Sequence, residues 1–342
     1  MRRDECGTTF GNIAMDYRLS QCKKSFLSDV DTIIDFTKID RKLKKKYNPK
    51  HRLDGSPAYP SLMMFKILLL QCWYNLSDYE AEELLIVRLD FMKFVGLDME
   101  SDIPDHSTIS RFRSSLLSLN LYDKLLHEIN IQLEQQNLLV KSGAIVDASM
   151  VESSRRPRRI VQEIPEDRNE SEAEGVSHEI KYSSDIDAKW LKKGKKYYYG
   201  YKIHVAVDAA KGFILGGHIT GANVSDMTEL EQVITKSRID QGTLIFADKG
   251  YSSKSNREYI ESNNMIDGIM FKAARNKPLT EAEKNHNSVI SKCRYKIERT
   301  FGNLKQHHGF TRMRYLGLAK AEMEFLLKAM AFNIKKAALQ TC

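Results

Sequence analysis

The sequence has few cysteines, and their arrangement excludes several kinds of small stabilised domain. There are five in 342 residues, at positions 6, 22, 72, 293 and 342. Their number is odd and no two lie in a Cys-x-x-Cys pair, so neither a disulfide framework nor a zinc knuckle is indicated. Scattered free cysteines fit a protein of the reducing cytoplasm.

Long hydrophobic runs are also missing. The longest apolar segment, residues 62–70, is interrupted by Lys66 and is too short to cross a bilayer. The first residues, Met1 to Cys6, lead into no apolar segment of the kind found in signal peptides. We therefore expect no membrane partner and no secretory signal.

The chain does have enough apolar residues for a core, together with an excess of positive charge. Hydrophobic residues make up 42% of it, and its 342 residues predict two domains or one domain with a large appendage. The net charge of +8 favours a polyanionic partner, of which nucleic acid is the commonest. A ribosome-like or simply basic soluble protein would carry the same charge.

The first part of the chain predicts helices. Residues 1–25 are weakly patterned and are expected to form an arm, whereas residues 26–137 have the apolar periodicity of an all-helical domain. In that domain we expect helices over residues 26–47, 61–74, 77–88, 91–95 and 116–136, and a further helix that begins near Asp105.

The helix that begins near Asp105 displays Arg111 and Arg113 in its early turns. This arrangement resembles the recognition helix of a helix-turn-helix, which enters a DNA groove with its N-terminal half. An amphipathic helix with solvated arginines explains the same residues equally well.

From residue 138 onward the pattern is that of an α/β domain reaching residue 342. It is interrupted by a charged insertion, residues 153–196, in which an acidic patch lies between two basic ends. Such charge blocks are typical of solvated loops, although the basic ends could follow a phosphate backbone. A mixed sheet is predicted from strands at residues 143–151, 197–207, 213–219, 242–251 and 266–272, with helices at 227–237, 255–262, 288–305 and 320–339.

Two aspartates stand at corresponding places in this sheet. Asp147 lies on the first strand and Asp248 ends the fourth. If these strands are parallel neighbours, the crossover between them brings the two carboxylates side by side, beyond the carboxyl ends of the strands. Crowded carboxylates repel one another unless a cation lies between them, and Mg²⁺ or Mn²⁺ is the natural occupant.

A third acid, Glu298, lies on the predicted helix 288–305. At about 100° per residue, Arg294, Glu298 and Lys305 fall within about 40° of one another on one helix face. Glu298 would complete a metal site, and two ions about 3.5–4 Å apart would suit phosphodiester chemistry. An ordinary Arg294–Glu298 pair on a solvated helix is the alternative, with a stabilisation of only about 0.2–0.5 kcal/mol.

Other polar residues have simpler explanations. Asp208 abuts a turn, and Asp226 begins a helix, where capping is sufficient. His204 lies on a strand and is expected to be a hydrogen-bonded histidine of the core or its rim. The tyrosines at positions 197–199 and Tyr201 could stack on bases, but strand alternation places at least half of them in the core.

Taken together, these motifs resemble the DDE transposases of bacterial insertion sequences, most closely the fifth insertion-sequence family. The likeness covers nearly the whole chain from about residue 26 and is specific through the order and spacing of the motifs. The first of them are Val146-Asp147-Ala148, Ala247-Asp248-Lys249-Gly250-Tyr251 and Arg294-x3-Glu298-x6-Lys305. Residues 74–78, 105–113, 199–204, 222–226 and 303–305 also resemble segments of that family.

The resemblance implies a ribonuclease H-like catalytic domain in which Asp147, Asp248 and Glu298 bind two Mg²⁺ or Mn²⁺ ions. It implies nicking at the ends of the element and attack of the freed 3′-hydroxyl on target DNA. It further implies a homo-oligomer, a dimer on DNA, in a bacterial cytoplasm in association with the nucleoid. The residues expected to contact DNA are Arg294, Lys305, Arg111, Arg113 and Lys202.

One position departs from the pattern. Related insertion-sequence families carry a tyrosine three residues before the arginine, where this chain has Ser291. A stacking or phosphate contact there is therefore in doubt, whereas the triad is unaffected. Two other functions are compatible with the motifs: a metal-dependent DNA nuclease without strand transfer, and an inactive DNA-binding repressor.

Overall fold

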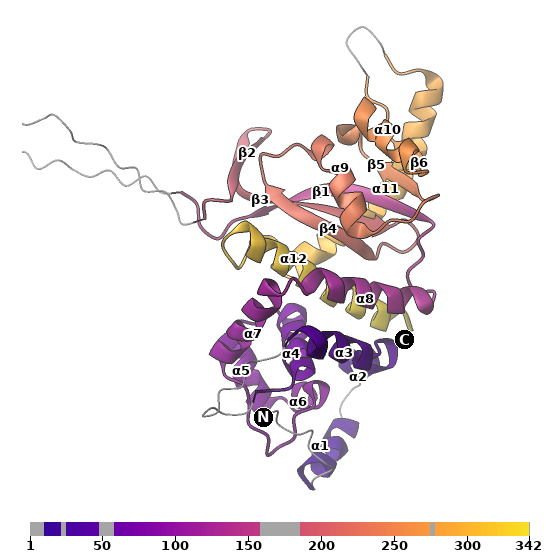
Figure 1. The fold of residues 1–342 in the computed structure, drawn as a ribbon. Helices are drawn as coiled ribbons and strands as arrows, with labels where there is room; N and C mark the ends of the chain where they lie inside the picture. The colour runs from indigo at the N-terminus through magenta and orange to yellow at the C-terminus, as the bar shows by residue number, and fades with distance from the viewer. Residues whose placement is uncertain (1–9, 22–24, 48–57, 158–184, 274–277, 342) are drawn as a thin grey trace, which may run out of the picture.

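The computed structural model describes residues 10–21, 25–47, 58–157, 185–273 and 278–341 (Figure 1). Two arginines of the charged insertion, Arg158 and Arg159, and its acidic patch at residues 163–174 lie outside these ranges. The chain has a helical N-terminal part and a mixed sheet flanked by helices, which confirms the predicted fold class.

The N-terminal part is all-helical over its described residues. Several of its boundaries differ from the sequence prediction. The expected arm contains a helix, α1, and the expected helix 26–47 is broken at Asp35, whose side chain caps the second piece by accepting from the Thr37 amide at 3.0 Å. The helices are α1 (Phe10–Ser20), α2 (Phe26–Ile33), α3 (Phe36–Lys46), α4 (Ser61–Tyr74), α5 (Asp78–Val87), α6 (Leu89–Val95), α7 (His106–Ser118) and α8 (Tyr122–Gln135).

Local capping explains where several of these helices begin. Ser77 and Glu80 form the capping box of α5, and the Asp105 side chain accepts from the Thr108 amide at 2.6 Å at the start of α7. Helix α8 begins only at Tyr122, because the chain turns at Leu119–Leu121 rather than continuing one helix from residue 116.

The C-terminal part contains one sheet of six strands. They are β1 (Gly143–Glu152), β2 (Lys189–Lys193), β3 (Lys196–Asp208), β4 (Ile214–Gly221), β5 (Leu244–Ala247) and β6 (Ile266–Ile269). Strand β3 pairs antiparallel with β1 along one edge and with β2 and β4 along the other, and β5 and β6 continue parallel to β1. The order β4-β3-β1-β5-β6 is that of a ribonuclease H-like sheet.

Strand β2 corrects the expectation that residues 153–196 form only a solvated insertion. Its Lys189–Lys193 segment pairs with Lys196–Gly200 of β3. Four of its five side chains are exposed, so it lacks the buried face that marks a strand in a sequence, and its pairing depends on the backbone of β3.

Long helices cover the sheet. The structure has η2 (Asp226–Thr228), α9 (Leu230–Ser237), η3 (Lys249–Tyr251), α10 (Lys254–Ser262), α11 (Glu281–His307) and α12 (Leu318–Thr341). Helix α11 begins earlier than residue 288, because Thr280 and Glu283 form a capping box in the segment predicted to be a polar connection.

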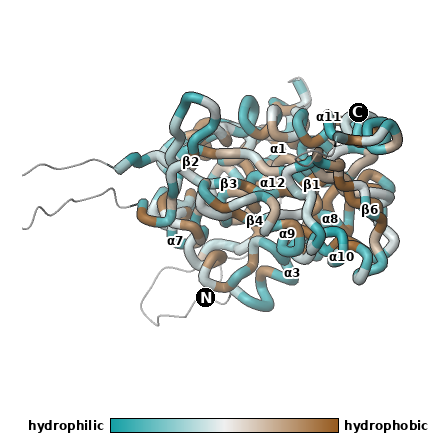
Figure 2. Tube along the Cα trace, turned by 90° about the horizontal axis from the view of Figure 1, so that it is seen from above, coloured by the Kyte–Doolittle hydropathy of each residue, from teal (hydrophilic) through white to brown (hydrophobic). Residues whose placement is uncertain are grey.

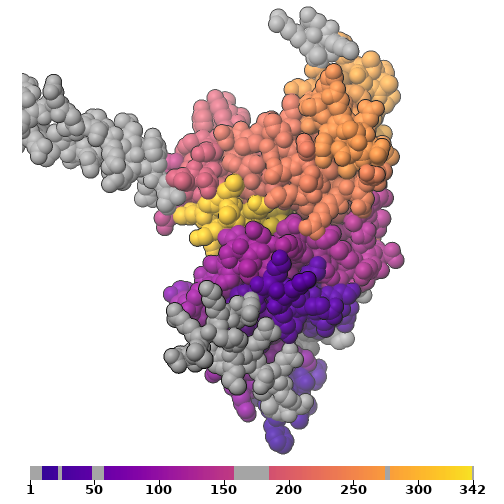
Figure 3. Space-filling view, in the orientation of Figure 1, coloured from indigo at the N-terminus to yellow at the C-terminus, as the bar shows by residue number. Residues whose placement is uncertain are grey.

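Helix α12 joins the two parts of the molecule. It packs against β4 on one side and against α2, α4 and α8 on the other, and Figures 1 and 3 show it between the sheet and the helical part. The buried Asn333 side chain accepts from the Ile214 amide at 2.9 Å and donates to Asn130 of α8 at 2.8 Å. The buried hydrophobic residues accordingly form one continuous core.

Figure 2 shows hydrophilic and hydrophobic stretches distributed along the whole described trace. In the described ranges no helix is sufficiently long and apolar to cross a membrane.

Candidate active site

The two aspartates lie side by side where the parallel pairing of β1 and β5 ends, Asp147 within β1 and Asp248 directly after β5. Strands β1 and β5 pair in parallel with Val146 opposite Ala247, and each aspartate is the next residue. The Asp147 carboxylate accepts from the Ala148 amide at 2.8 Å. Asp248 ends its strand and caps η3, accepting from the Lys249 amide at 2.7 Å. The register of the sheet therefore brings the two carboxylates together.

Arg294 of α11 bridges these carboxylates. Its Nη2 atom is 2.7 Å from Asp147 Oδ2, and its Nη1 atom is 3.4 Å from Asp248 Oδ1. Helix α11 is placed by its buried face, because Ile290, Ile297 and Leu304 pack inward while the helix lies against β1 and β5. The guanidinium thus lies between the two carboxylates, where the sequence analysis expected Mg²⁺ or Mn²⁺.

Burial and charge shift the pKa values in opposite directions here. Burial raises the pKa of Asp147 more than the neighbouring Arg294 lowers it, and Asp248 raises it further. Burial acts to lower the pKa of Arg294, but the carboxylates of Asp147, Asp248 and Glu298 raise it overall. The arginine therefore stays charged and the carboxylates depend on it for compensation.

Glu298 lies one turn beyond Arg294 on α11 and its side chain is exposed. It acts electrostatically on Arg294. Over the described part of the chain, no three histidine, cysteine, aspartate or glutamate side chains are grouped closely enough to hold a metal ion. The structure brings Asp147 and Asp248 together, and it places Glu298 on the adjacent helix without closing the three acids into one ligand set.

Tyr251 is a residue of this site to which the sequence reasoning assigned no role. Its side chain is fully buried, and its hydroxyl has no hydrogen-bond partner among the described residues. Burial raises the pKa of Tyr251 well above its usual value, and the charges of Asp226, Asp147 and Asp248 add to the effect. Its position at the end of the Asp-Lys-Gly-Tyr motif was the available signal.

The residues expected to contact DNA lie in different environments. Arg111 is 74% exposed on α7, whereas Arg113 is 4% exposed and its guanidinium donates to Asp78 and Gln71. Lys202 lies beneath the surface, with its Nζ atom 2.8 Å from Asp226 Oδ1. Lys305 is half-buried on α11, where burial and the nearby Lys193 lower its pKa.

The structure also shows the environments of His204 and Asp208. His204 is fully buried, as expected of a core histidine, and its Nε2 atom lies 2.9 Å from Thr220 Oγ1. Asp208 is a turn residue, because its carboxylate accepts from the amides of Ala210 and Lys211 at 2.9 and 2.6 Å.

Comparison with known proteins identifies the family. Residues 139–334 match the family described as Transposase DDE domain, and residues 15–115 match the one described as Transposase domain (DUF772). The chain belongs to the DDE transposases. It is therefore an enzyme that cleaves and transesterifies DNA, and enzymes of this family use divalent metal ions.

Individual proteins are similar to this transposase over most of its length. The transposase for insertion sequence element IS1106 from Neisseria meningitidis serogroup B is 37% identical over 230 residues, covering 67% of this chain and 77% of the relative. A piggyBac transposase synaptic complex with hairpin DNA aligns at a TM-score of 0.41 and 11% identity, covering 93% of this chain and 74% of that one. The Mos1 mariner paired end complex with Mn aligns at 0.26 and 8% identity, covering 96% and 90%.

Proposed function

We propose that this transposase binds the terminal inverted repeats of an insertion sequence, nicks the element ends and joins the freed 3′-hydroxyl to target DNA. The observation that carries the proposal is that Asp147 and Asp248 lie side by side on adjacent parallel strands around a single cation. A surface salt bridge would not require residues so distant in the chain to meet.

The donor set fits Mg²⁺ or Mn²⁺. Asp147 and Asp248 supply carboxylate oxygens on adjacent strands, and the guanidinium between them marks a place that a positive charge stabilises. Asp147 and Asp248 would hold the metal, and Glu298, exposed one turn beyond Arg294, would join them. When bound, two such ions supply charge that stabilises the attacking and leaving oxygens of phosphodiester transfer.

The roles of Arg294, Tyr251 and the other cations expected to contact DNA follow from their environments. Arg294 neutralises the aspartates when no metal is bound. When metal ions compensate the aspartates, its planar guanidinium is available to a phosphate. The buried Tyr251 hydroxyl can donate a hydrogen bond to an acceptor that enters the site. Arg111 and Lys305 contact the DNA backbone. Arg113 instead positions Asp78, and Lys202 positions Asp226, because each cation is bound to that carboxylate.

Three substitutions test the carboxylates. Asp147→Asn, Asp248→Asn and Glu298→Gln should each lower nicking of labelled element ends in Mg²⁺ by more than about 100-fold, because each removes a charged group that acts in the transition state. Binding of the ends, measured by gel shift, should change little. Glu281→Gln is the matched control, since Glu281 is an exposed carboxylate on the same helix. Near-normal nicking by any of the three variants would show that the wrong acids were chosen.

Strand transfer is tested separately with the wild-type protein. Labelled ends incubated with a supercoiled plasmid should become joined to it, and ends that are cut but never joined would indicate a nuclease instead. Failure to bind Mn²⁺ at millimolar concentration in calorimetry would indicate a DNA-binding repressor. Sedimentation of the protein on paired ends tests the proposed dimer.

A further inference from the structure

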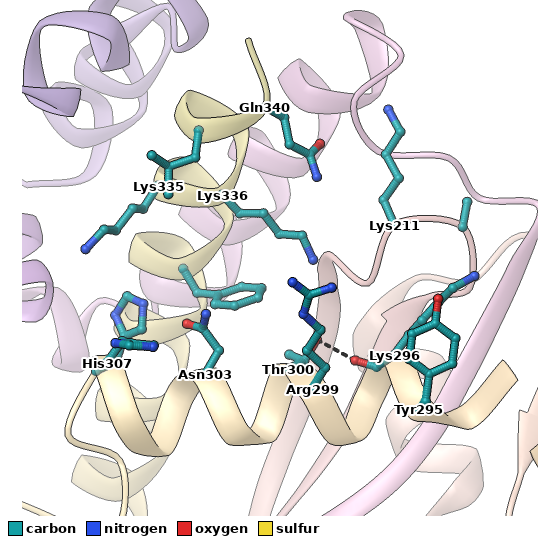
Figure 4. Close-up of a pocket in the computed structure, with 14 residues that line it drawn as sticks. Lys211, Tyr295, Lys296, Arg299, Thr300, Asn303, His307, Lys335, Lys336 and Gln340 are labelled. Carbon is teal, nitrogen blue, oxygen red and sulfur yellow. Dashed lines mark hydrogen bonds between the residues drawn. The ribbon is translucent and has the colours of Figure 1, made fainter. Parts of the chain in front are cut away.

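A cavity rich in positive charge lies on the far side of α11 from the aspartates. It has a volume of about 530 Å³ and opens between α11, α12 and the turn that follows β3 (Figure 4). Five of its lining residues are Lys211, Lys296, Arg299, Lys335 and Lys336. In Figure 4 the Lys336 and Arg299 side chains approach one another across the cavity, and the Lys211 side chain extends upward from the turn at its rim.

Among the described residues these cations have no carboxylate in ion-pair contact. None of the described lining residues is an aspartate or glutamate, and within the described ranges none of the five cations forms an ion pair. Several cations elsewhere are paired with carboxylates, as Lys42 is with Glu128 and Lys236 with Glu322. In the cavity, lysines instead donate to backbone carbonyls: Lys211 to Asn137 at 3.0 Å, Lys336 to Gly212 at 2.9 Å and Lys296 to Ala209.

The surroundings of the cavity destabilise the charged forms of two of its lysines. The pKa of Lys336 is lowered to about 8, chiefly by burial; the nearby Asp208 acts to raise it and Arg299 acts to lower it. Burial also lowers the pKa of Lys335. The Asp208 carboxylate accepts from the amides of Ala210 and Lys211, so it is committed to the turn. An anion in the cavity would relieve this repulsion.

The cavity is separate from the carboxylate site. Lys296, Arg299 and Asn303 lie about 100–160° around the α11 axis from Glu298. DNA at the aspartates therefore meets one face of the helix, and the cavity faces another direction. Thr300, Asn303 and Gln340 add neutral polar groups to the lining, a mixture suited to phosphodiester oxygens.

We propose that this cavity binds backbone phosphates of a duplex segment other than the one cut at the carboxylates. The inference rests on the proposed function only in taking DNA as the polyanion. It gives α11 two DNA-facing surfaces, one carrying Arg294 and Glu298 and the other carrying Arg299 and Lys296. The strand that is cut and a second DNA segment would thereby be held on opposite sides of one rigid helix.

Lysine footprinting of the wild-type protein is the first test. Acetylation of Lys211 and Lys335 is measured by mass spectrometry with and without a short mixed-sequence duplex, in the absence of divalent metal. Both should become protected, whereas Lys320, exposed on the same α12, should react equally in the two samples. Unchanged reactivity of Lys211 and Lys335 would overturn the proposal. Equal protection by inorganic phosphate at the same phosphate concentration would also overturn it, because the cavity would then take a free anion.

Salt dependence is the second test. The double variant Lys211→Gln, Arg299→Gln should lower the slope of log K against log salt for duplex binding by about 1.8, since each lost phosphate contact removes about 0.9. The control Lys320→Gln should keep the wild-type slope, and a double variant that also keeps it would refute the proposal. Neither test requires cleavage. If the Asp248→Asn variant no longer nicks DNA but DNA still protects its Lys335 from acetylation, the carboxylate site and the cavity act separately, and the two proposals are distinguished.

Discussion

Arg294 is the single side chain whose removal should change the carboxylate site most. Its guanidinium is 15% exposed and bridges carboxylates of 17% and 35% exposure. The substitution Arg294→Gln keeps a polar side chain of similar length and removes the charge. Asp147 and Asp248 would then face one another with no cation between them.

The expected loss of folding stability follows from this burial. Removing one partner of a fully buried ion pair costs about 3–5 kcal/mol. Solvent reaches part of this site, chiefly at Asp248, so we expect the free energy of unfolding in EDTA to fall by about 1–3 kcal/mol at pH 7. Proton uptake by Asp147, whose pKa burial already raises, limits the loss.

Divalent metal should reverse the effect. In the variant, Mg²⁺ or Mn²⁺ can bind between the aspartates without displacing a guanidinium. A ligand at 100 times its dissociation constant adds about 2.7 kcal/mol of stability. The gain in stability on adding metal should therefore be larger in Arg294→Gln than in the wild type.

Urea unfolding followed by circular dichroism, in EDTA and in millimolar Mg²⁺, measures both quantities. Arg299→Gln is the control, because Arg299 lies on the same helix and has no carboxylate partner among the described residues. Wild-type stability of Arg294→Gln in EDTA, together with an equal metal effect in the two proteins, would refute the idea that this arginine compensates the aspartates.

Two further predictions concern the core. Burial lowers the pKa of His204 to about 3 from 6.5, so the folded state keeps it neutral while the unfolded chain takes up a proton. The contribution of neutral His204 to the free energy of unfolding is complete above pH 6.5 and is lost as the pH falls toward 3. The loss is about 2 kcal/mol at pH 5. Urea unfolding at pH 7 and 5 should show a smaller pH effect in His204→Gln, and an equal effect would contradict this. The substitution Asn333→Leu leaves the Asn130 side-chain oxygen and the Ile214 amide without their partner and should lower the free energy of unfolding by about 3 kcal/mol, whereas a change below about 0.5 kcal/mol would show that the contact is unimportant.

Local features of the fold could be predicted where the signal was local. Ser77 with Glu80, and Asp105 alone, begin helices where their side chains cap the first amides. The start of α11 was missed although Thr280 and Glu283 carry the same spacing as the box of α5, because the surrounding residues are polar. Strand β2 could not be predicted, since its lysine-rich segment is ordered by pairing with β3 rather than by a buried face.

The sequence by itself determined the kinds of acid, their strands and their order, and it predicted that Asp147 and Asp248 would meet if the first and fourth strands were parallel neighbours. The reason is that parallel neighbours in a sheet end at the same edge. Only the tertiary structure decided which cation lies between them, that Tyr251 is buried beneath them, and that Arg113 and Lys202 bind acids inside the protein. It also decided that five cations meet in a cavity behind α11. These features depend on how helices pack against a sheet, which brings together side chains that no local pattern relates.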